Sequence, residues 1–102
     1  MLEMRPNCEL CDCDLAPESI MARICSYECT FCADCVDDIL QNVCPNCGGG
    51  FVARPIRPAV ARREGVSLGH QPASTKRVLS PYSEQQIREF ANRVKDTPAK
   101  QR

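Results

Sequence analysis

The apolar positions of the chain form short, separate runs in the first half and one periodic stretch near the end. Two short runs, 20–24 and 30–31, flank a polar turn, and this pattern predicts a β-hairpin. In 34–42 the apolar residues recur three or four positions apart, which predicts a helix of two to three turns with Asp34 as its N-cap. Residues 51–52 are apolar again and are expected to form a last short strand.

The second half begins with a long polar stretch. Residues 59–81 are rich in arginine, proline, serine, alanine and glycine, so we expect a largely disordered basic linker there. In 82–96 apolar residues return at i, i+3, i+4 and i+7, which predicts an amphipathic helix that begins with a capping box of Ser83 and Gln86. A helix this short is marginal alone, so it must bury its apolar face either on the preceding domain or on a partner. Residues 97–102 are expected to be a disordered tail.

The charge of the chain is divided between its two halves. The whole chain has 13 basic and 13 acidic residues, but residues 1–50 contain two basic residues against nine acidic ones. Residues 51–102 contain eleven basic residues against four acidic ones, and such an asymmetry indicates two units with different roles. The basic residues after the first unit are candidates for contacts with nucleic-acid phosphates, and they are Arg54, Arg57, Arg62, Arg63, Lys76 and Arg77.

The nine cysteines carry the strongest chemical signal, and all of them lie between residues 8 and 47. Eight form four couples with two or three residues between the partners, and these couples are Cys8 and Cys11, Cys25 and Cys29, Cys32 and Cys35, and Cys44 and Cys47. Zinc–thiolate bonds are about 2.3 Å long, so two sulfurs on one tetrahedral ion lie about 3.8 Å apart, which this spacing allows. Four couples therefore predict two four-sulfur sites and two Zn²⁺ ions. Cys13 is left over, as a bystander thiol or an alternative ligand.

A metal framework is favoured over a disulfide framework. The number of cysteines is odd, every couple has metal-ligand spacing, and no signal-peptide pattern is visible at the start of the sequence. No run approaches the roughly 18 apolar residues of a membrane span. We therefore expect a cytoplasmic protein whose thiols stay reduced.

The couples can be paired on the two ions in sequential or interleaved order. Sequential pairing joins the first couple to the second and the third to the fourth. Interleaved pairing gives a site 1 of Cys8, Cys11, Cys32 and Cys35 and a site 2 of Cys25, Cys29, Cys44 and Cys47. Only Thr30 and Phe31 separate the second couple from the third, so the chain must cross between two sites there, which favours interleaving. Interleaving also adds long-range constraint to a domain with little apolar core.

The full spacing, C-x2-C-x13-C-x3-C-x2-C-x2-C-x8-C-x2-C, resembles the cross-brace pattern of the RING finger in an all-cysteine form. The run from Met1 to Pro58 also closely resembles a family of small, mostly bacterial proteins, domain-of-unknown-function family 1272. The shared segments are Leu-Glu-Met-Arg-Pro-Asn-Cys and Cys-Pro-Asn-Cys-Gly-Gly. Together these resemblances imply a small metal-stabilised α+β domain over residues 1–58. It would be a RING-like binuclear treble clef with a short hairpin, one helix and two zinc knuckles.

The RING resemblance also implies positions for partner contacts. RING ubiquitin ligases hold their conjugating enzyme with an apolar residue in the first couple, one on the central helix and a proline in the last couple. Leu10, Ile39 and Pro45 match these positions. A basic residue often follows the last ligand in such ligases, but Gly48 stands there in this chain, so ligase activity is not favoured.

Closed sites of four thiolates leave no position for a water molecule, so they are structural rather than catalytic. We therefore expect no enzyme but a zinc-binding interaction module that contacts a protein through its platform or through Ile87, Phe90 and Val94 of the helix. One alternative is a nucleic-acid-binding protein that uses the basic arm. A ubiquitin-ligase-like or redox protein is less favoured, although Cys44-Pro-Asn-Cys47-Gly also resembles an iron-binding rubredoxin knuckle.

Overall fold

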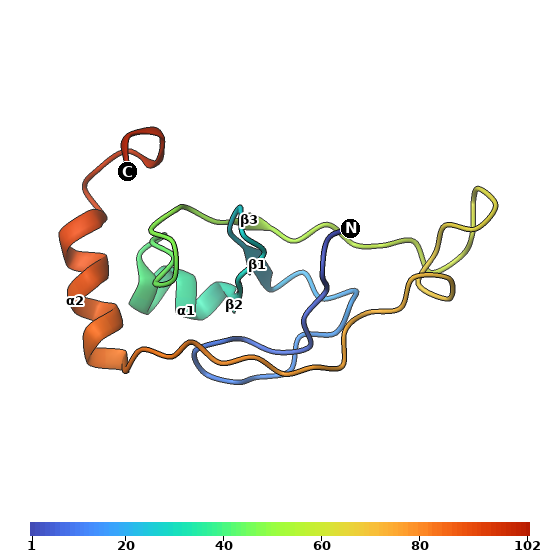
Figure 1. The fold of residues 1–102 in the computed structure, drawn as a ribbon, viewed down its shortest axis with the longest axis horizontal. Helices are drawn as coiled ribbons and strands as arrows, with labels where there is room; N and C mark the ends of the chain where they lie inside the picture. Colours follow the sequence, from blue (N-terminus) through green and yellow to red (C-terminus); the bar gives the residue numbers. More distant parts are fainter.

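A small three-stranded antiparallel sheet lies at the centre of the molecule (Figure 1), in a computed structural model that describes residues 1–102. Strand β1 (Ala22–Ile24) pairs with β2 (Thr30–Cys32) on one side and with β3 (Val52–Ala53) on the other. The expected hairpin and the last short strand are therefore both present, and each strand differs by one or two residues from its expected range. The sheet order is β2-β1-β3, so β1 lies in the middle.

A short helical segment follows β2 directly. It comprises α1 (Ala33–Cys35) and the wider-wound η1 (Val36–Leu40), where the Gln41 N–H reaches back five residues to the Val36 carbonyl. The predicted helix, 34–42, ran two residues too far, because Gln41 and Asn42 take positive φ angles of 49° and 60° and end it. Asp34 is not the N-cap. The sulfur of Cys32 has that role and accepts a hydrogen bond from the Cys35 N–H at 3.4 Å.

The core is built largely from cysteines. Six of the twelve residues in the central buried cluster are members of the four couples. The largest buried apolar side chains are Phe31, Leu40, Ile87 and Val43, and the Phe31 ring contacts the edge of Phe51 with ring centroids 5.4 Å apart. A domain with so few apolar side chains buries little surface on folding, so its cysteines must contribute to holding it together.

The segment after β3 is ordered, and the expectation of a largely disordered linker at 59–81 is wrong. Residues 74–80 run alongside residues 4–9 (Figure 1) and are joined to them by backbone hydrogen bonds from Ser74 N to Met4 O and from Ser80 N to Glu9 O. The buried Asn7 side chain also exchanges two hydrogen bonds with the Val78 backbone, at 2.8 and 3.2 Å. The composition of this segment hid such contacts, because they use the backbone rather than apolar side chains.

Opposite charges join the basic segment to the acidic first half. The Arg77 guanidinium contacts Asp12 at 2.9 Å and Asp14 at 2.6 Å, and Arg57 donates to the backbone carbonyls of Leu2 and Gln71. Exposed ion pairs of this kind contribute little individually. Together with the backbone contacts they explain why a polar segment has a defined position.

Arg54 has a different role, because it is buried, with 4% of its surface exposed. Its guanidinium donates to the carbonyls of Arg5 and Ala16, at 2.8 and 3.0 Å, and burial lowers its pKa. No carboxylate lies within ion-pair distance of it. Arg54 thus ties the chain after β3 to the N-terminal loops.

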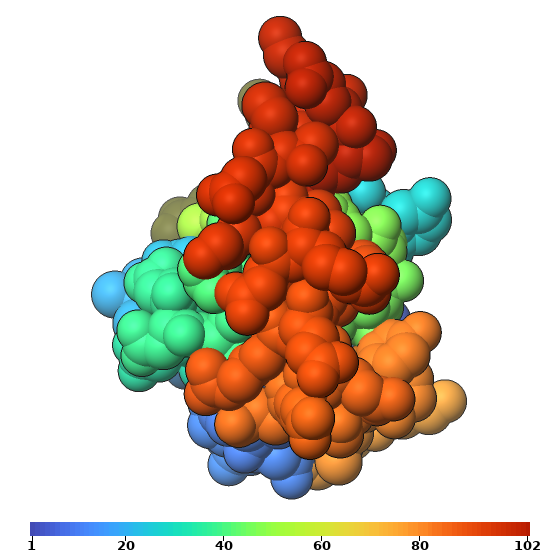
Figure 2. Space-filling model, turned by 90° about the vertical axis from the view of Figure 1, so that its left-hand side faces the viewer, coloured from blue at the N-terminus to red at the C-terminus, as the bar shows by residue number.

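Helix α2 (Glu84–Val94) begins with the predicted capping box of Ser83 and Gln86 and packs on η1. Ile87 and Ala91, each 1% exposed, face the domain, and Ile87 belongs to the central core cluster. The apolar face of this helix was expected to pack either on the preceding domain or on a partner, and in the structure it packs on the preceding domain. Figure 2 shows α2 lying across one end of the molecule, in front of the residues that follow the central helix.

The expected disordered tail is also ordered. Residues Ala99–Gln101 form the short helix η2, and the Arg102 guanidinium donates to the Asn42 carbonyl at 2.7 Å. No helix of the chain is both long enough and apolar enough to cross a membrane.

Replacing Ile87 with alanine should loosen α2 from the domain. The lost burial and the cavity should lower the free energy of unfolding by about 2–5 kcal/mol. The measurement is denaturant unfolding, with limited proteolysis near residues 74–83 as a local readout. Ile20→Ala is the matched control, because Ile20 is 78% exposed, and equal stability of the two variants would contradict the packing role of Ile87.

Candidate metal centres

Four cysteines from two distant couples form the first group of sulfurs, and they are Cys8, Cys11, Cys32 and Cys35. All four sulfurs lie within 4.8 Å of one another, and the Cys11 and Cys32 sulfurs, from different couples, are 3.8 Å apart. This distance equals the edge of a zinc–thiolate tetrahedron, which is about 3.8 Å for bonds of about 2.3 Å. The residues therefore fit a tetrahedral metal ion.

The second group contains three sulfurs within 4.8 Å of one another, those of Cys25, Cys44 and Cys47. Cys29, expected as its fourth member, does not lie within that distance of all three. Its side chain is buried, with 8% exposed, and burial raises the pKa of its thiol. The fold thus brings the first couple to the third, and Cys25 of the second couple to the fourth, as the interleaved arrangement predicts.

Two couples have the same local geometry, and we call them the first knuckle (Cys8–Cys11) and the last knuckle (Cys44–Cys47). Cys8–Cys11 is followed by Asp12 with φ of 63°, and Cys44–Cys47 is followed by Gly48 with φ of 81°. In each case the N–H of that residue donates to the carbonyl of the first cysteine, at 2.9 and 2.7 Å. The left-handed residue turns the chain so that both sulfurs point to one side. Glycine and aspartate accept this conformation more readily than most residues.

Backbone N–H groups point at the sulfurs of both groups. Tyr27 N donates to Cys25 Sγ at 3.3 Å and Gly49 N donates to Cys47 Sγ at 3.4 Å, as Cys35 N does to Cys32 Sγ. Such donors stabilise thiolates, because they place partial positive charge beside the sulfur. The same arrangement on both groups favours thiolates that bind a metal over neutral thiols in a core.

The thiols differ in their acidity without metal. Burial raises the pKa of Cys8, Cys29, Cys35 and Cys44 above the usual value. Partial burial opposes ionisation of Cys11 too, but hydrogen bonds from neighbouring groups, the Cys13 N–H first, lower its pKa to about 7. The buried thiols therefore hold protons at neutral pH that a metal ion must displace.

Cys13 lies beside the first group but is not a member of it. It is exposed, and partial burial together with the neighbouring Cys11 raises its pKa to about 12. A thiol with a raised pKa is mostly protonated at neutral pH and is a poor nucleophile. These properties agree with a bystander more than with a reactive thiol.

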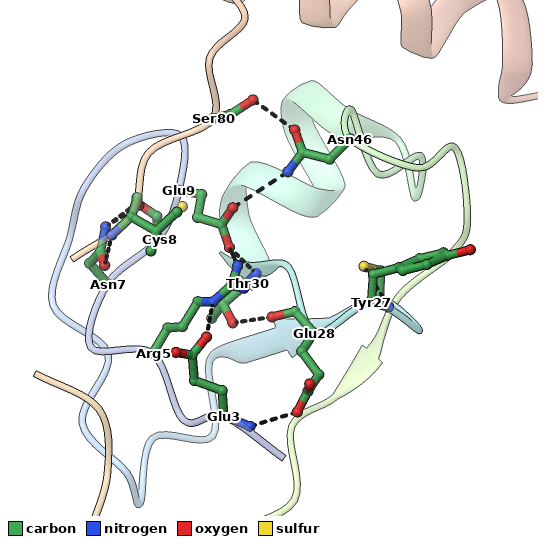
Figure 3. A network of polar contacts seen from close by, with 12 residues as sticks. Glu3, Arg5, Asn7, Cys8, Glu9, Tyr27, Glu28, Thr30, Asn46 and Ser80 are labelled. Atoms are coloured by element: carbon green, nitrogen blue, oxygen red, sulfur yellow. Dashed lines mark hydrogen bonds and ion pairs between the residues drawn. The ribbon is translucent and has the colours of Figure 1, made fainter. Parts of the chain in front are cut away.

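A buried carboxylate between the two groups was missed in the sequence. Glu9, 3% exposed, accepts hydrogen bonds from the Thr30 N–H, from Arg5 and from the Asn46 amide (Figure 3). Burial opposes the charge of Arg5, but its hydrogen bonds to Glu3 and Glu9 raise its pKa. The signal in the sequence was a charged residue inside a cysteine couple, where it cannot move far from the metal ligands.

The six residues expected to contact a partner have different environments. Leu10 and Ile39 are partly buried and pack against the core, and Ile87 belongs to it. Pro45 and Phe90 line a groove of about 490 Å³ between the last cysteine couple and α2, whereas Val94 lies half-buried further along the helix. Helix α2 therefore covers part of the surface that was expected to contact a partner.

The basic residues proposed for nucleic acid are partly used within the chain. Arg54 is buried, Arg57 donates to the carbonyls of Leu2 and Gln71, and Arg77 contacts the carboxylates of Asp12 and Asp14. The exposed cations that remain from that set are Arg62, Arg63 and Lys76. Nucleic-acid binding stays a prediction, with half of its expected phosphate contacts already engaged elsewhere.

Serine substitutions should show which couples share an ion. We expect Cys8→Ser and Cys32→Ser to weaken the same one of two bound ions, because their sulfurs belong to one group. Metal content by mass spectrometry and competition with a chelator measures this. Cys13→Ser should retain both ions, and a shared effect of Cys8→Ser and Cys25→Ser would instead support sequential pairing.

Metal affinity should fall as the pH is lowered. The four thiols of the couples that have raised pKa values are protonated without metal, so each must release a proton on binding. Calorimetry in buffers of different ionisation enthalpy counts the released protons, and binding without proton release would contradict thiolate ligation.

Comparison with known proteins agrees with the cysteine framework. The family described as a protein of unknown function (DUF1272) matches residues 1–57, which include all nine cysteines. An uncharacterized protein of Rhizobium meliloti (strain 1021) is 56% identical over 81 residues, covering 79% of this chain and 89% of the relative. No solved structure matches the chain. The chain belongs to the DUF1272 family of proteins of unknown function.

Proposed function

We propose that this protein is a small interaction module held together by two Zn²⁺ ions. The observation that carries the proposal is the pair of interleaved sulfur groups, each drawn from couples far apart in the sequence. Bringing such sulfurs together costs chain entropy, which metal binding offsets. Zinc is the metal favoured by tetrahedral sets of thiolates.

The interleaved sulfurs and the short hairpin support a RING-like cross-brace with a treble-clef arrangement. The β1–β2 hairpin carries Cys25 and Cys29 at its turn, while Cys32 and Cys35 start the helix that follows. One continuous segment thus supplies ligands to both groups. A metal ion at each group would fix the hairpin against the two knuckles.

The second site would be completed by Cys29. The Cys29 side chain is already buried, and the Cys25 N–H donates to the Cys29 carbonyl at 3.2 Å, so the two residues of this couple are joined through the backbone. With four thiolates each, both ions would be closed to water and would have a structural role. This coordination supports a binding module rather than an enzyme.

The groove beside α2 is the surface that we assign to a protein partner. Its apolar wall is formed by Pro45, Ile87, Phe90 and the 48% exposed Tyr82. The Arg93 guanidinium lies 5.5 Å from the centre of the Phe90 ring and adds a polar rim. Exposed aromatic and arginine side chains around a small hollow are typical of protein interfaces.

Removal of metal should unfold the domain. We expect two zinc ions per chain, and a strong chelator should abolish the circular dichroism and dispersed amide signals of residues 1–57 as it removes them. A chain that keeps its fold without metal would contradict the structural role. A coloured protein with iron in the sites would contradict zinc.

Replacing Phe90 with serine should abolish partner capture without unfolding the chain, because Phe90 is half-buried at the groove. Arg88→Ser, at an exposed position on another side of α2, is the control. Partners are retained from a lysate of the source organism and compared by quantitative mass spectrometry. A partner that binds both variants equally would place the interaction outside the groove.

A further inference from the structure

A network of polar side chains connects segments that supply both sulfur groups (Figure 3). Glu9 is its central residue and lies inside the first couple, between Cys8 and Cys11. One carboxylate oxygen accepts from the Thr30 N–H at 2.5 Å and from Arg5 at 2.7 Å. The other accepts from the Asn46 amide at 3.4 Å.

Two of the partners of Glu9, Thr30 and Asn46, belong to segments that supply metal ligands. Thr30 lies between Cys29, assigned to the second site, and Cys32 of the first. Asn46 lies between Cys44 and Cys47 of the second group. A single carboxylate therefore contacts the first knuckle, the bridge between the sites and the last knuckle.

The backbone reinforces the same link. Glu9 N donates to the Thr30 carbonyl at 2.9 Å, so Glu9 and Thr30 are joined by both backbone and side chain. Ser80 adds two further hydrogen bonds to the network. Its N–H donates to the Glu9 carbonyl, and its hydroxyl donates to the Asn46 side-chain oxygen at 3.1 Å. When the first knuckle closes around its ion, Glu9 is fixed, and with it the positions of Thr30 and Asn46.

A buried carboxylate needs a reason to be there, because burying a charge is unfavourable unless it is paired and hydrogen-bonded. The Arg5 guanidinium supplies the pairing, and the Thr30 N–H and the Asn46 amide supply the remaining hydrogen bonds. Removal of any one donor leaves the anion less well satisfied. The network is therefore sensitive to the position of both knuckles at once.

We propose that Glu9 is a positioning residue that couples the two metal sites, so that an ion in site 1 raises the affinity of site 2 for its own ion. The coupling rests on the proposed function, since it needs both sites to bind metal. Coupling between sites is reciprocal, so filling site 2 raises the affinity of site 1 by the same factor. A chain with such coupling exists mostly with no ions or with two, and seldom with one.

The test is a double-mutant cycle with zinc as the probe, in a full-length chain and a chelator-buffered titration. The amide signals of Tyr27 and Gly49 report site 2, because these N–H groups donate to its sulfurs, and the Cys35 signal reports site 1. Cys11→Ser removes one ligand of site 1. We expect it to lower the zinc affinity of site 2 about tenfold in the wild-type background, a typical size for coupling between sites.

In a Glu9→Gln background the same Cys11→Ser change should have less than about a third of that effect. The amide has one acceptor oxygen, so if that oxygen keeps Thr30 and Arg5, its NH₂ faces the Asn46 amide and cannot accept from it. Glu3→Gln is the matched control. The Glu3 side chain also pairs with Arg5, at 2.6 Å, but contacts no cysteine couple. Its backbone N–H donates to Glu28, between Cys25 and Cys29, and the Gln variant keeps that N–H, so this background should behave like the wild type.

An equal loss of site 2 affinity in the wild-type and Glu9→Gln backgrounds would overturn the proposal. It would show that the two sites are coupled through the rest of the chain and not through Glu9. If Glu9→Gln fails to hold two ions, Asn46→Ala decides in the same cycle, because it removes the Glu9 contact to the last knuckle and leaves those to Thr30 and Arg5. It also removes the contact of the Ser80 hydroxyl, so Ser80→Ala is its control. Two ions that bind independently in the wild type also overturn the coupling, while the zinc module stands. A wild-type chain that binds no zinc overturns the proposed function itself.

Discussion

The whole structure depends on bringing the sulfurs of distant cysteines to within a few ångströms of one another. Six of the twelve residues in the buried cluster are cysteines, and the apolar side chains around them are too few to replace them. Burial raises the pKa of several of these thiols, so they keep their protons until a metal ion binds. A metal ion would exchange those protons for strong bonds and supply the stability that a small core lacks.

The interleaved arrangement explains why so short a chain forms one unit. The hairpin and the helix after it send ligands to both groups, so neither group can form without ordering the segment that they share. Between the groups lies Glu9, whose hydrogen bonds to Thr30 and Asn46 connect the same segments through side chains. The shared chain segment and the buried hydrogen bonds of Glu9 thus both link the two sulfur groups.

The basic second half is part of this unit. Its backbone hydrogen bonds with residues 4–9 and the contact of Arg77 with Asp12 and Asp14 place it along the acidic first half. Helix α2 then closes the end of the domain with Ile87 and leaves a groove bordered by Phe90 and Pro45. The division of charge between the halves, which indicated two separate roles, serves at least partly to hold the two halves together.

The sequence by itself determined the elements whose cause is local. Two short apolar runs around a polar turn specified the hairpin, Ser83 and Gln86 specified the start of α2, and the cysteine spacing specified four couples. Only the tertiary structure decided that Arg54 is buried, that residues 59–81 are ordered, and that Cys29 stands apart from the other three sulfurs of its group. Each of these depends on which distant backbone groups come close, and composition carries no record of that. Glu9 shows the same limit, because a charged residue between two cysteines becomes a link between two sites only when the fold places Thr30 and Asn46 beside it.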